Sequence, residues 1–144
     1  MQSLRRPTRV LDLGTGTGIL AIAAAKLFRV PVLAADNDPI AVATARANAA
    51  TNGVAALVRA VESEGLRSPA LRGRFDLVLA NILARPLASL ASALAAHLSP
   101  RGSLVLSGCL SEQEALVLSA YRAQRLFLRR RLVDDGWVTL VLAR

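Results

Sequence analysis

The chain has 144 residues, of which 53% are hydrophobic and 3% aromatic, and its formal net charge is +8. This length suits one domain with a single core. Charges such as Lys26 and Asp36 interrupt every apolar run before it reaches the roughly 18 residues of a membrane span, so we expect no membrane-spanning segment. The N-terminal residues lack the apolar region of a signal peptide. Cys109 is the only cysteine, which excludes an internal disulfide and, with the missing signal, leads us to expect a cytoplasmic protein.

The positive charge is carried by arginine, because Lys26 is the only lysine. The arginines are scattered, and the local cluster Arg129–Arg131 falls on a predicted strand, whose alternation would divide it between two faces. The few aromatic residues do not interleave with arginines as a base-stacking surface would. We therefore expect a solvated basic surface in preference to a nucleic-acid groove.

Short apolar runs alternate with helical stretches along the chain. The runs that predict buried strands lie at residues 8–13, 31–36, 55–61, 75–81 and 103–108. Helices are predicted at residues 17–28, 39–52, 87–98 and 111–124, and residues 62–74 read as a loop with at most one short turn. Repeats, linkers and low-complexity segments are lacking, so residues 1–144 form one predicted domain.

Several helix ends carry sequence signals. Asp38 is placed to cap a helix that starts at Pro39 and ends before Gly53. The motif Ser-Pro-Arg-Gly at residues 99–102 predicts a turn that stops the third helix. Ser111, with Glu114 after it, predicts a capping box at the start of the fourth.

The C-terminal region predicts a hairpin, because Asp134-Asp135-Gly136 separates two apolar strand candidates. The alternation of strands and helices before the hairpin predicts a parallel sheet with right-handed crossovers. Because the two strands of a hairpin are antiparallel, the last strand would run against the others. We therefore expect an α/β fold: a Rossmann-like, doubly wound, mostly parallel seven-stranded sheet with an antiparallel C-terminal hairpin strand. This pattern is typical of methyltransferases and differs from that of dinucleotide dehydrogenases.

A glycine-rich loop follows the first predicted strand, with the spacing G-x-G-x-G at Gly14, Gly16 and Gly18. The nicotinamide fingerprint would need a glycine where Ile19 stands. Asp12, just before the loop, would repel a pyrophosphate but attract the ammonium group of S-adenosylmethionine. The alternative is that Asp12 binds backbone amides at the strand end.

Two further acids follow predicted strands. Asp36 lies about twenty residues after the loop, where an acid typically binds ribose hydroxyls. Glu62 is nearest the tip of the third strand and is a candidate for the adenine side, although a solvated loop acid is nearly as good an interpretation. The candidate cofactor-binding residues are Asp12, Gly14, Thr15, Gly16, Gly18, Asp36, Asn37, Glu62 and Asn81.

Three stretches carry a resemblance to a known family: VLDLGTGTGILAIAAAKL, FDLVLANILARPL and DGWVTLVL. The first resembles the class I S-adenosylmethionine-dependent methyltransferases. The other two are more specific and resemble the catalytic domain of the methyltransferases that act on ribosomal protein L11. The resemblance covers almost the whole chain. It implies S-adenosylmethionine as cofactor, and methyl transfer to lysine side-chain and N-terminal amines of that ribosomal protein by direct in-line displacement.

By this resemblance, Asn81 is the candidate catalytic residue at the tip of the fourth strand, where it would orient the acceptor amine. Related amino-methyltransferases follow this position with Pro-Pro and an aromatic residue, whereas Ile82, Leu83 and Ala84 follow here. Without the prolines and the aromatic residue the site cannot stack on a flat, conjugated substrate, which suits a narrow, flexible amine. Ile82 and Leu83 are therefore candidate substrate contacts. Asn81 could also cap the turn before Arg85. We find no dedicated general base, and no Cys/His cluster that predicts a metal.

The chain departs from this family in length. Similar proteins are about twice as long and carry an N-terminal substrate-recognition domain, so we expect a fragment, a misassigned start, or a domain that needs a partner chain, with one sheet face lacking helix cover. The alternatives are an RNA or small-molecule methyltransferase on the same fold, and an inactive S-adenosylmethionine-binding domain.

Overall fold

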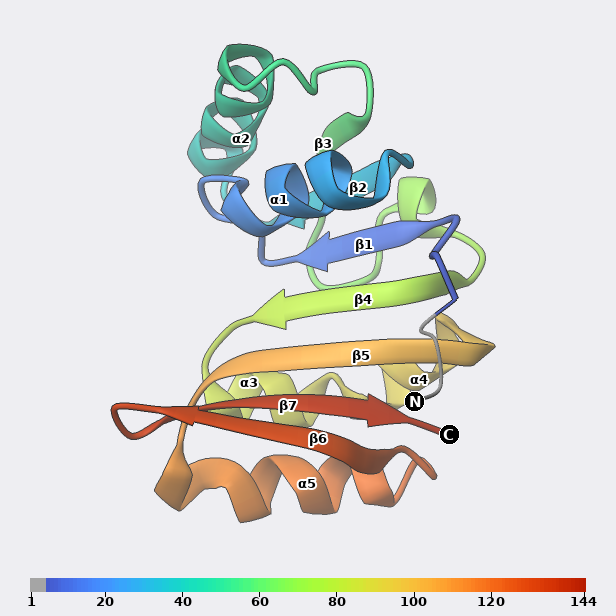
Figure 1. The fold of residues 1–144 in the computed structure, drawn as a ribbon, viewed down its shortest axis with the longest axis vertical. Coiled ribbons are helices and arrows are strands. Elements are labelled where there is room, and N and C mark those ends of the chain that lie inside the picture. The colour runs from blue at the N-terminus through green and yellow to red at the C-terminus, as the bar shows by residue number, and fades with distance from the viewer. Residues whose placement is uncertain (1–4) are drawn as a thin grey trace.

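A computed structural model describes residues 5–144 as one seven-stranded sheet flanked by helices (Figure 1). The strands are β1 (Val10–Leu13), β2 (Val32–Asp36), β3 (Val58–Glu62), β4 (Phe75–Asn81), β5 (Leu98–Leu110), β6 (Phe127–Asp134) and β7 (Trp137–Ala143). The helices are α1 (Ile19–Phe28), α2 (Pro39–Thr51), α3 (Ala84–Ser89), α4 (Ala91–Ala96) and α5 (Glu114–Arg122), with short 3-10 turns at η1 (Pro69–Leu71) and η2 (Ser111–Gln113). Within residues 5–144, no helix is long and apolar enough to cross a membrane.

The strand order is β3-β2-β1-β4-β5-β7-β6, and the first five strands pair in parallel. β7 is antiparallel to both of its neighbours, β5 and β6. Asp135 and Gly136 in the connecting turn both have positive φ, of 49° and 79°, as a tight hairpin turn requires. The predicted mostly parallel sheet with a reversed hairpin strand is confirmed.

The start of α2 agrees with its sequence signals. The Asp38 side chain accepts a hydrogen bond from the Ile40 amide at 2.9 Å, and Pro39 is the first helical residue. Gly53 follows the helix with φ of 72°.

The prediction of one helix over residues 87–98 was wrong. The helix begins earlier, at Ala84, and breaks at Leu90 into α3 and α4. The Ser-Pro-Arg-Gly segment does not end a helix as a free turn, because it lies within β5. There it bulges out of the ladder: Leu98 pairs with Phe75, but Ser103 pairs with Leu77.

The predicted capping box of Ser111 and Glu114 was also wrong. The Leu110 amide donates to the Gln113 side chain at 2.9 Å, and the Ser111 hydroxyl donates to the Gly136 carbonyl at 3.2 Å. Glu114 instead forms an ion pair with Arg131 of β6, with 2.7 Å between nitrogen and oxygen. The local capping contact is thus made by Gln113, and Glu114 has a long-range partner instead.

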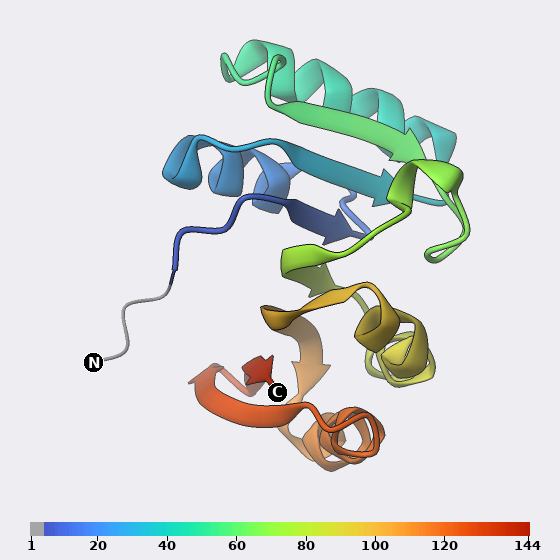
Figure 2. The same cartoon turned by 90° about the vertical axis from the view of Figure 1, so that its right-hand side faces the viewer.

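The helices cover the two faces of the sheet unequally (Figure 2). α3, α4 and α5 pack on one face and form the larger core cluster, which includes Val78, Leu104 and Leu140. α1 and α2 cover β1, β2 and β3 on the other face. Over β4, β5, β7 and β6 that second face has no helix among the described residues. Alternation places Trp137 there, 52% exposed. The expected uncovered face is confirmed for the described part of the chain.

Candidate functional site

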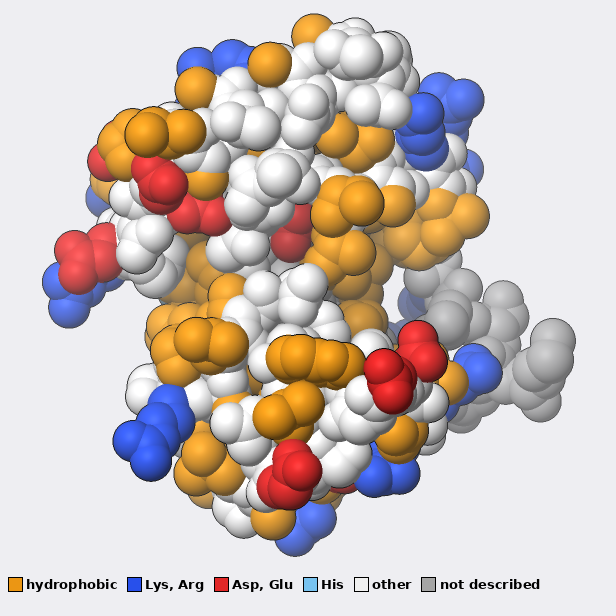
Figure 3. All heavy atoms as spheres, turned by 90° about the vertical axis from the view of Figure 1, so that its left-hand side faces the viewer, with side chains coloured by type: hydrophobic (Ala, Val, Ile, Leu, Met, Phe, Trp, Pro, Cys, Tyr) orange, Lys and Arg blue, Asp and Glu red, His pale blue; other side chains and the backbone are white. Residues whose placement is uncertain are grey.

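A cleft of about 400 Å³ opens at the C-terminal edge of the parallel strands. Its lining residues are Leu13, Gly14, Asp36, Asn37, Ser63, Gly65, Ile82, Leu83, Pro86 and Leu90. β1 lies between β2 and β4, so the chain leaves the centre of the sheet in opposite directions, and ligands of doubly wound folds bind where this happens. Figure 3 looks onto this edge and shows acidic side chains beside the hollow.

The glycine loop connects β1 to α1 and forms one wall of the cleft. The amides of Gly14 and Thr15 both donate to the Ala35 carbonyl, at 2.8 and 2.9 Å, which fastens the loop to the end of β2. Gly14, Gly16 and Gly18 all have positive φ, which favours glycine.

The loop glycines have different surroundings. A Cβ on Gly18 would lie 3.0 Å from the Ala45 side chain, so this glycine allows the loop to pack against α2. A Cβ on Gly16 would meet no atom within 4 Å. The Gly16 backbone therefore faces open space, as a surface that a ligand approaches closely would.

Asp12 faces the loop and the start of α1. Its carboxylate accepts hydrogen bonds from the Thr15 hydroxyl at 2.7 Å and from the Ala21 amide at 3.0 Å, and the residue is 1% exposed. Burial raises the pKa of this carboxyl to about 6, against the lowering effect of those hydrogen bonds. The carboxylate does not line the cleft, so the geometry matches the alternative of an acid that binds backbone amides.

Asp36 ends β2 and lies in the wall of the cleft. One carboxylate oxygen accepts from the Gly16 amide at 2.9 Å and the other accepts from the Asp38 amide at 3.0 Å. The residue is half-buried, and Asn37 beside it is exposed and also lines the cleft. The strand tip and the glycine loop are thus joined through one carboxylate.

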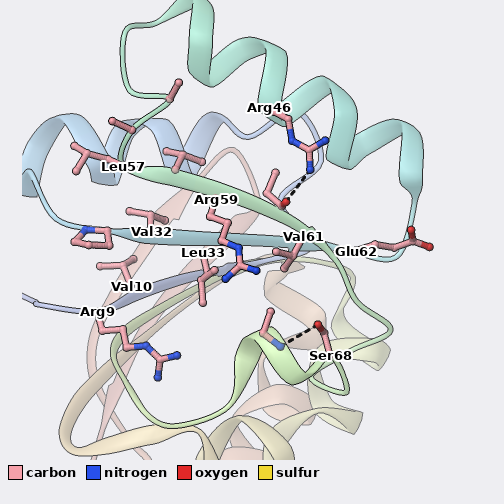
Figure 4. A pocket seen from close by; sticks show the side chains of 16 residues that line it. Arg9, Val10, Val32, Leu33, Arg46, Leu57, Arg59, Val61, Glu62 and Ser68 are labelled. Carbon is pink, nitrogen blue, oxygen red and sulfur yellow. Dashed lines mark hydrogen bonds between the residues drawn. The ribbon is translucent and has the colours of Figure 1, made fainter.

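Glu62 lies opposite Asp36 in the β2–β3 register, but it lines a different hollow. That hollow, of about 850 Å³, lies over β1, β2 and β3, and Arg9, Arg46 and Arg59 are among its lining residues (Figure 4). Its wall is aliphatic and basic, and it does not include the glycine loop. Although it is the larger hollow, it lacks the groups that the cleft brings together. The structure therefore does not bring Glu62 to the cleft.

Ser63 takes the place in the cleft that the sequence assigned to Glu62. Its amide donates to the Asp36 carbonyl at 2.8 Å, and its hydroxyl donates to the Gly65 carbonyl at 2.8 Å. The Ser68 amide donates back to that hydroxyl at 3.1 Å. This network folds the loop after β3 toward the cleft, and it depends on contacts within the folded loop that the sequence does not signal.

The segment after β4 forms the opposite wall. Ile82 and Leu83 line the cleft, whereas Asn81 is exposed at the end of β4 and pairs with Ser107 of β5. The Ile82 side chain lies against the glycine loop, since a Cβ on Gly14 would be 2.5 Å from Ile82 Cγ2. The predicted substrate segment and the predicted cofactor loop are therefore in contact.

Comparison with known proteins agrees with this geometry. The family model "Ribosomal protein L11 methyltransferase (PrmA)" matches residues 1–144. The chain is 53% identical over 140 residues to the ribosomal protein L11 methyltransferase of Rhodopseudomonas palustris (strain BisB5), covering 96% of this chain and 48% of that protein. It is 49% identical over 142 residues to the ribosomal protein L11 methyltransferase of Rhizobium rhizogenes (strain K84 / ATCC BAA-868). That match covers 97% of this chain and 49% of that protein. The chain thus spans about half the length of the curated relatives it matches.

Solved structures show the same likeness. A ribosomal protein L11 methylase from Lactobacillus delbrueckii subsp. bulgaricus superposes with a TM-score of 0.88 and 33% identity, over 99% of this chain and 72% of that one. An RNA methyltransferase from Salinibacter ruber, in complex with S-adenosyl-L-homocysteine, superposes with a TM-score of 0.74 and 23% sequence identity. The match covers 93% of this chain and 78% of that one, and it shows a shared fold. Because the family model matches from end to end, this chain belongs to the ribosomal protein L11 methyltransferase family.

Proposed function

We propose that this chain is the catalytic domain of an S-adenosylmethionine-dependent methyltransferase that methylates lysine or N-terminal amines of ribosomal protein L11. The observation that carries the proposal is the meeting of three parts in one cleft: the glycine loop, the Asp36 carboxylate and the segment of Ile82 and Leu83. Family membership supports the choice of chemistry and substrate.

The residues of the cleft fit the cofactor. The volume of about 400 Å³ is in the range of small-molecule sites. Gly16 leaves open space beside the loop, and Asp36 is placed at the strand tip where an acid accepts from ribose hydroxyls. A carboxylate oxygen accepts more than one hydrogen bond, so Asp36 can hold both the loop and a ribose. Asn37, Ser63 and Gly65 also line the cleft and would border the rest of the ligand.

When bound, S-adenosylmethionine supplies an electrophilic methyl group on a positively charged sulfur. The chain contributes position and polarity. Ile82 and Leu83 give the acceptor an aliphatic wall that excludes water, and the Asn81 amide oxygen and neighbouring carbonyls are candidates to accept hydrogen bonds from a neutral amine. Among the described residues, the lining of the cleft includes neither histidine nor cysteine, and its ionisable side chain is that of Asp36.

We also propose that substrate recognition needs a further domain or a partner chain, since the curated relatives are about twice as long. The domain would act in the cytoplasm on a ribosomal protein. Without that further part, the chain would bind the cofactor but transfer methyl groups slowly or not at all, and this is the alternative to be tested.

A methyl-transfer assay with radiolabelled S-adenosylmethionine tests the proposal. The chain is incubated with ribosomal protein L11, with L11 whose amines have been acetylated, and with ribosomal RNA. We expect label in L11 that acetylation abolishes. Label in the RNA would instead support an RNA methyltransferase, and no label from a chain that binds the cofactor would support the inactive domain.

A further inference from the structure

We propose that Gly108 of β5 is a positioning residue that sets the place of the acceptor segment Asn81–Leu83. This inference rests on the proposed function, because it assigns a role within the same cleft. Gly108 does not line the cleft and lies in none of the motifs that identify the family, so its role would act through the residues after β4.

Gly108 lies in a β-bulge at the level where β4 ends. Leu106 pairs with Leu140 of β7, but Cys109 pairs with Val138, so β5 carries one residue more than β7 between these pairs. On its other side, β5 makes its last pair with β4 between Ser107 and Asn81. The bulge therefore bends β5 just beyond the point where the acceptor segment leaves the sheet.

The backbone of Gly108 touches the acceptor segment closely. A Cβ at this position would lie 2.5 Å from the Ile82 carbonyl oxygen, 3.0 Å from its carbonyl carbon and 2.9 Å from the Asn81 Oδ1. Gly108 also has φ of 90°, which favours glycine. A residue with a side chain would have to push the Ile82–Leu83 peptide and the Asn81 side chain away.

The acceptor segment is held from the other side by Gly14. A Cβ there would lie 2.5 Å from Ile82 Cγ2, so Ile82 lies between Gly14 of the glycine loop and Gly108 of β5. One glycine contacts the side chain and the other contacts the main chain. Gly108 thereby sets the place of two hydrogen-bond acceptors at the end of β4, the Ile82 carbonyl and the Asn81 amide oxygen.

The test compares Gly108→Ala with Gly136→Ala. Both glycines have positive φ, of 90° and 79°, so alanine strains both, but a Cβ on Gly136 would meet no atom within 4 Å. We expect Gly108→Ala to shift the amide nuclear magnetic resonance signals of residues 81–83 and to lower turnover about 100-fold at saturating cofactor, with little change in cofactor affinity. Gly136→Ala should change neither.

A second pair of variants separates main-chain from side-chain crowding. Ile82→Ala removes the methyl group near Gly14, so it should partly restore cofactor affinity to Gly14→Ala, in which the positive φ of 71° still strains the alanine. It leaves the carbonyl in place, so it should not restore the signals of residues 81–83 in Gly108→Ala. Restoration there would overturn the proposal, as would unchanged signals in Gly108→Ala, or equal changes in Gly136→Ala.

Two controls keep the inference separate from the proposed function. Failure of the wild type to bind S-adenosylmethionine or to label L11 contradicts the proposed function, whereas the signals of residues 81–83 decide the role of Gly108 in either case. If Gly108→Ala does not fold, the nuclear magnetic resonance order parameters of the backbone amides of residues 81–83 in the wild type decide. Values of about 0.85, which indicate a rigid segment, support the proposal, and values below about 0.6 overturn it.

Discussion

Asp12 and Asp36 both lie near strand tips beside the glycine loop, yet their carboxylates face different surroundings. Asp12 is flanked by Leu11 and Leu13, which belong to the core beneath α3, α4 and α5. Alternation along the strand therefore turns Asp12 to the other face, where the first turn of α1 offers its amides. That signal was in the sequence. The inward turn of the loop at Ser63 had no comparable signal, because it depends on hydrogen bonds within the folded loop.

At Asp36 we predict a charge-dependent loss of cofactor affinity. Asp36→Asn keeps the shape of the side chain but removes the charge that strengthens hydrogen bonds to ribose hydroxyls, so the affinity for S-adenosylmethionine should fall by about 10- to 100-fold. Asp38→Asn is the matched control, because asparagine also caps helices well and Asp38 does not line the cleft. If equilibrium binding measurements gave equal affinities of Asp36→Asn and the wild type for S-adenosylmethionine, Asp36 would not be a cofactor-binding residue.

At Asp12 we predict a pH-dependent stability difference. Burial raises its pKa from 3.8 to about 6, so between these values the folded state binds more protons than the unfolded state. The stability that protonated Asp12 contributes is therefore lost as pH rises from about 4 to about 6. Asp12→Asn lacks this loss. The free energy of unfolding of Asp12→Asn minus that of the wild type should therefore increase by up to about 3 kcal/mol between pH 4 and pH 7. Urea unfolding at several pH values measures the difference, and a constant value would contradict the assignment.

At the scale of elements, the break between α3 and α4 coincides with a contact from a distant helix. Among the hydrogen bonds of the described residues, the Leu87 carbonyl near the end of α3 is paired with the Tyr121 hydroxyl of α5 at 2.7 Å. Tyr121 is fully buried, and burial raises the pKa of its phenol, so it remains a donor. Local sequence predicted one continuous helix because residues 87–98 are good helix formers, and a partner from α5 could not be read from them.

Tyr121→Phe should destabilise the fold by about 1–3 kcal/mol, because it leaves the Leu87 carbonyl buried without its donor. Urea unfolding measures this. Ser89→Ala, which removes an exposed hydroxyl from the same helix, should cost no more than about 0.5 kcal/mol. A loss for Tyr121→Phe no larger than that of Ser89→Ala would show that the hydroxyl does not support the break.

At the scale of the whole molecule, alternation of strands and helices was enough to predict the parallel sheet and its reversed hairpin strand. It could not give the length of β5, since Pro100 and Gly102 look like a turn locally and are absorbed by a bulge only when β4 lies beside them. Nor could it show that Glu62 lies outside the cleft, because strand-end position was the only guide. The placement of Ile82 against Gly14 likewise needs two segments distant in sequence.

The central claim is that the cleft between the glycine loop and the segment after β4 binds S-adenosylmethionine. Calorimetric titration of the wild-type chain with S-adenosylmethionine and, separately, with NAD tests it most directly. Because Ile19 stands where the nicotinamide fingerprint needs glycine, we predict saturable one-to-one binding of S-adenosylmethionine and no comparable binding of NAD. No binding heat for S-adenosylmethionine from the folded chain, or tighter binding of NAD, would contradict the account.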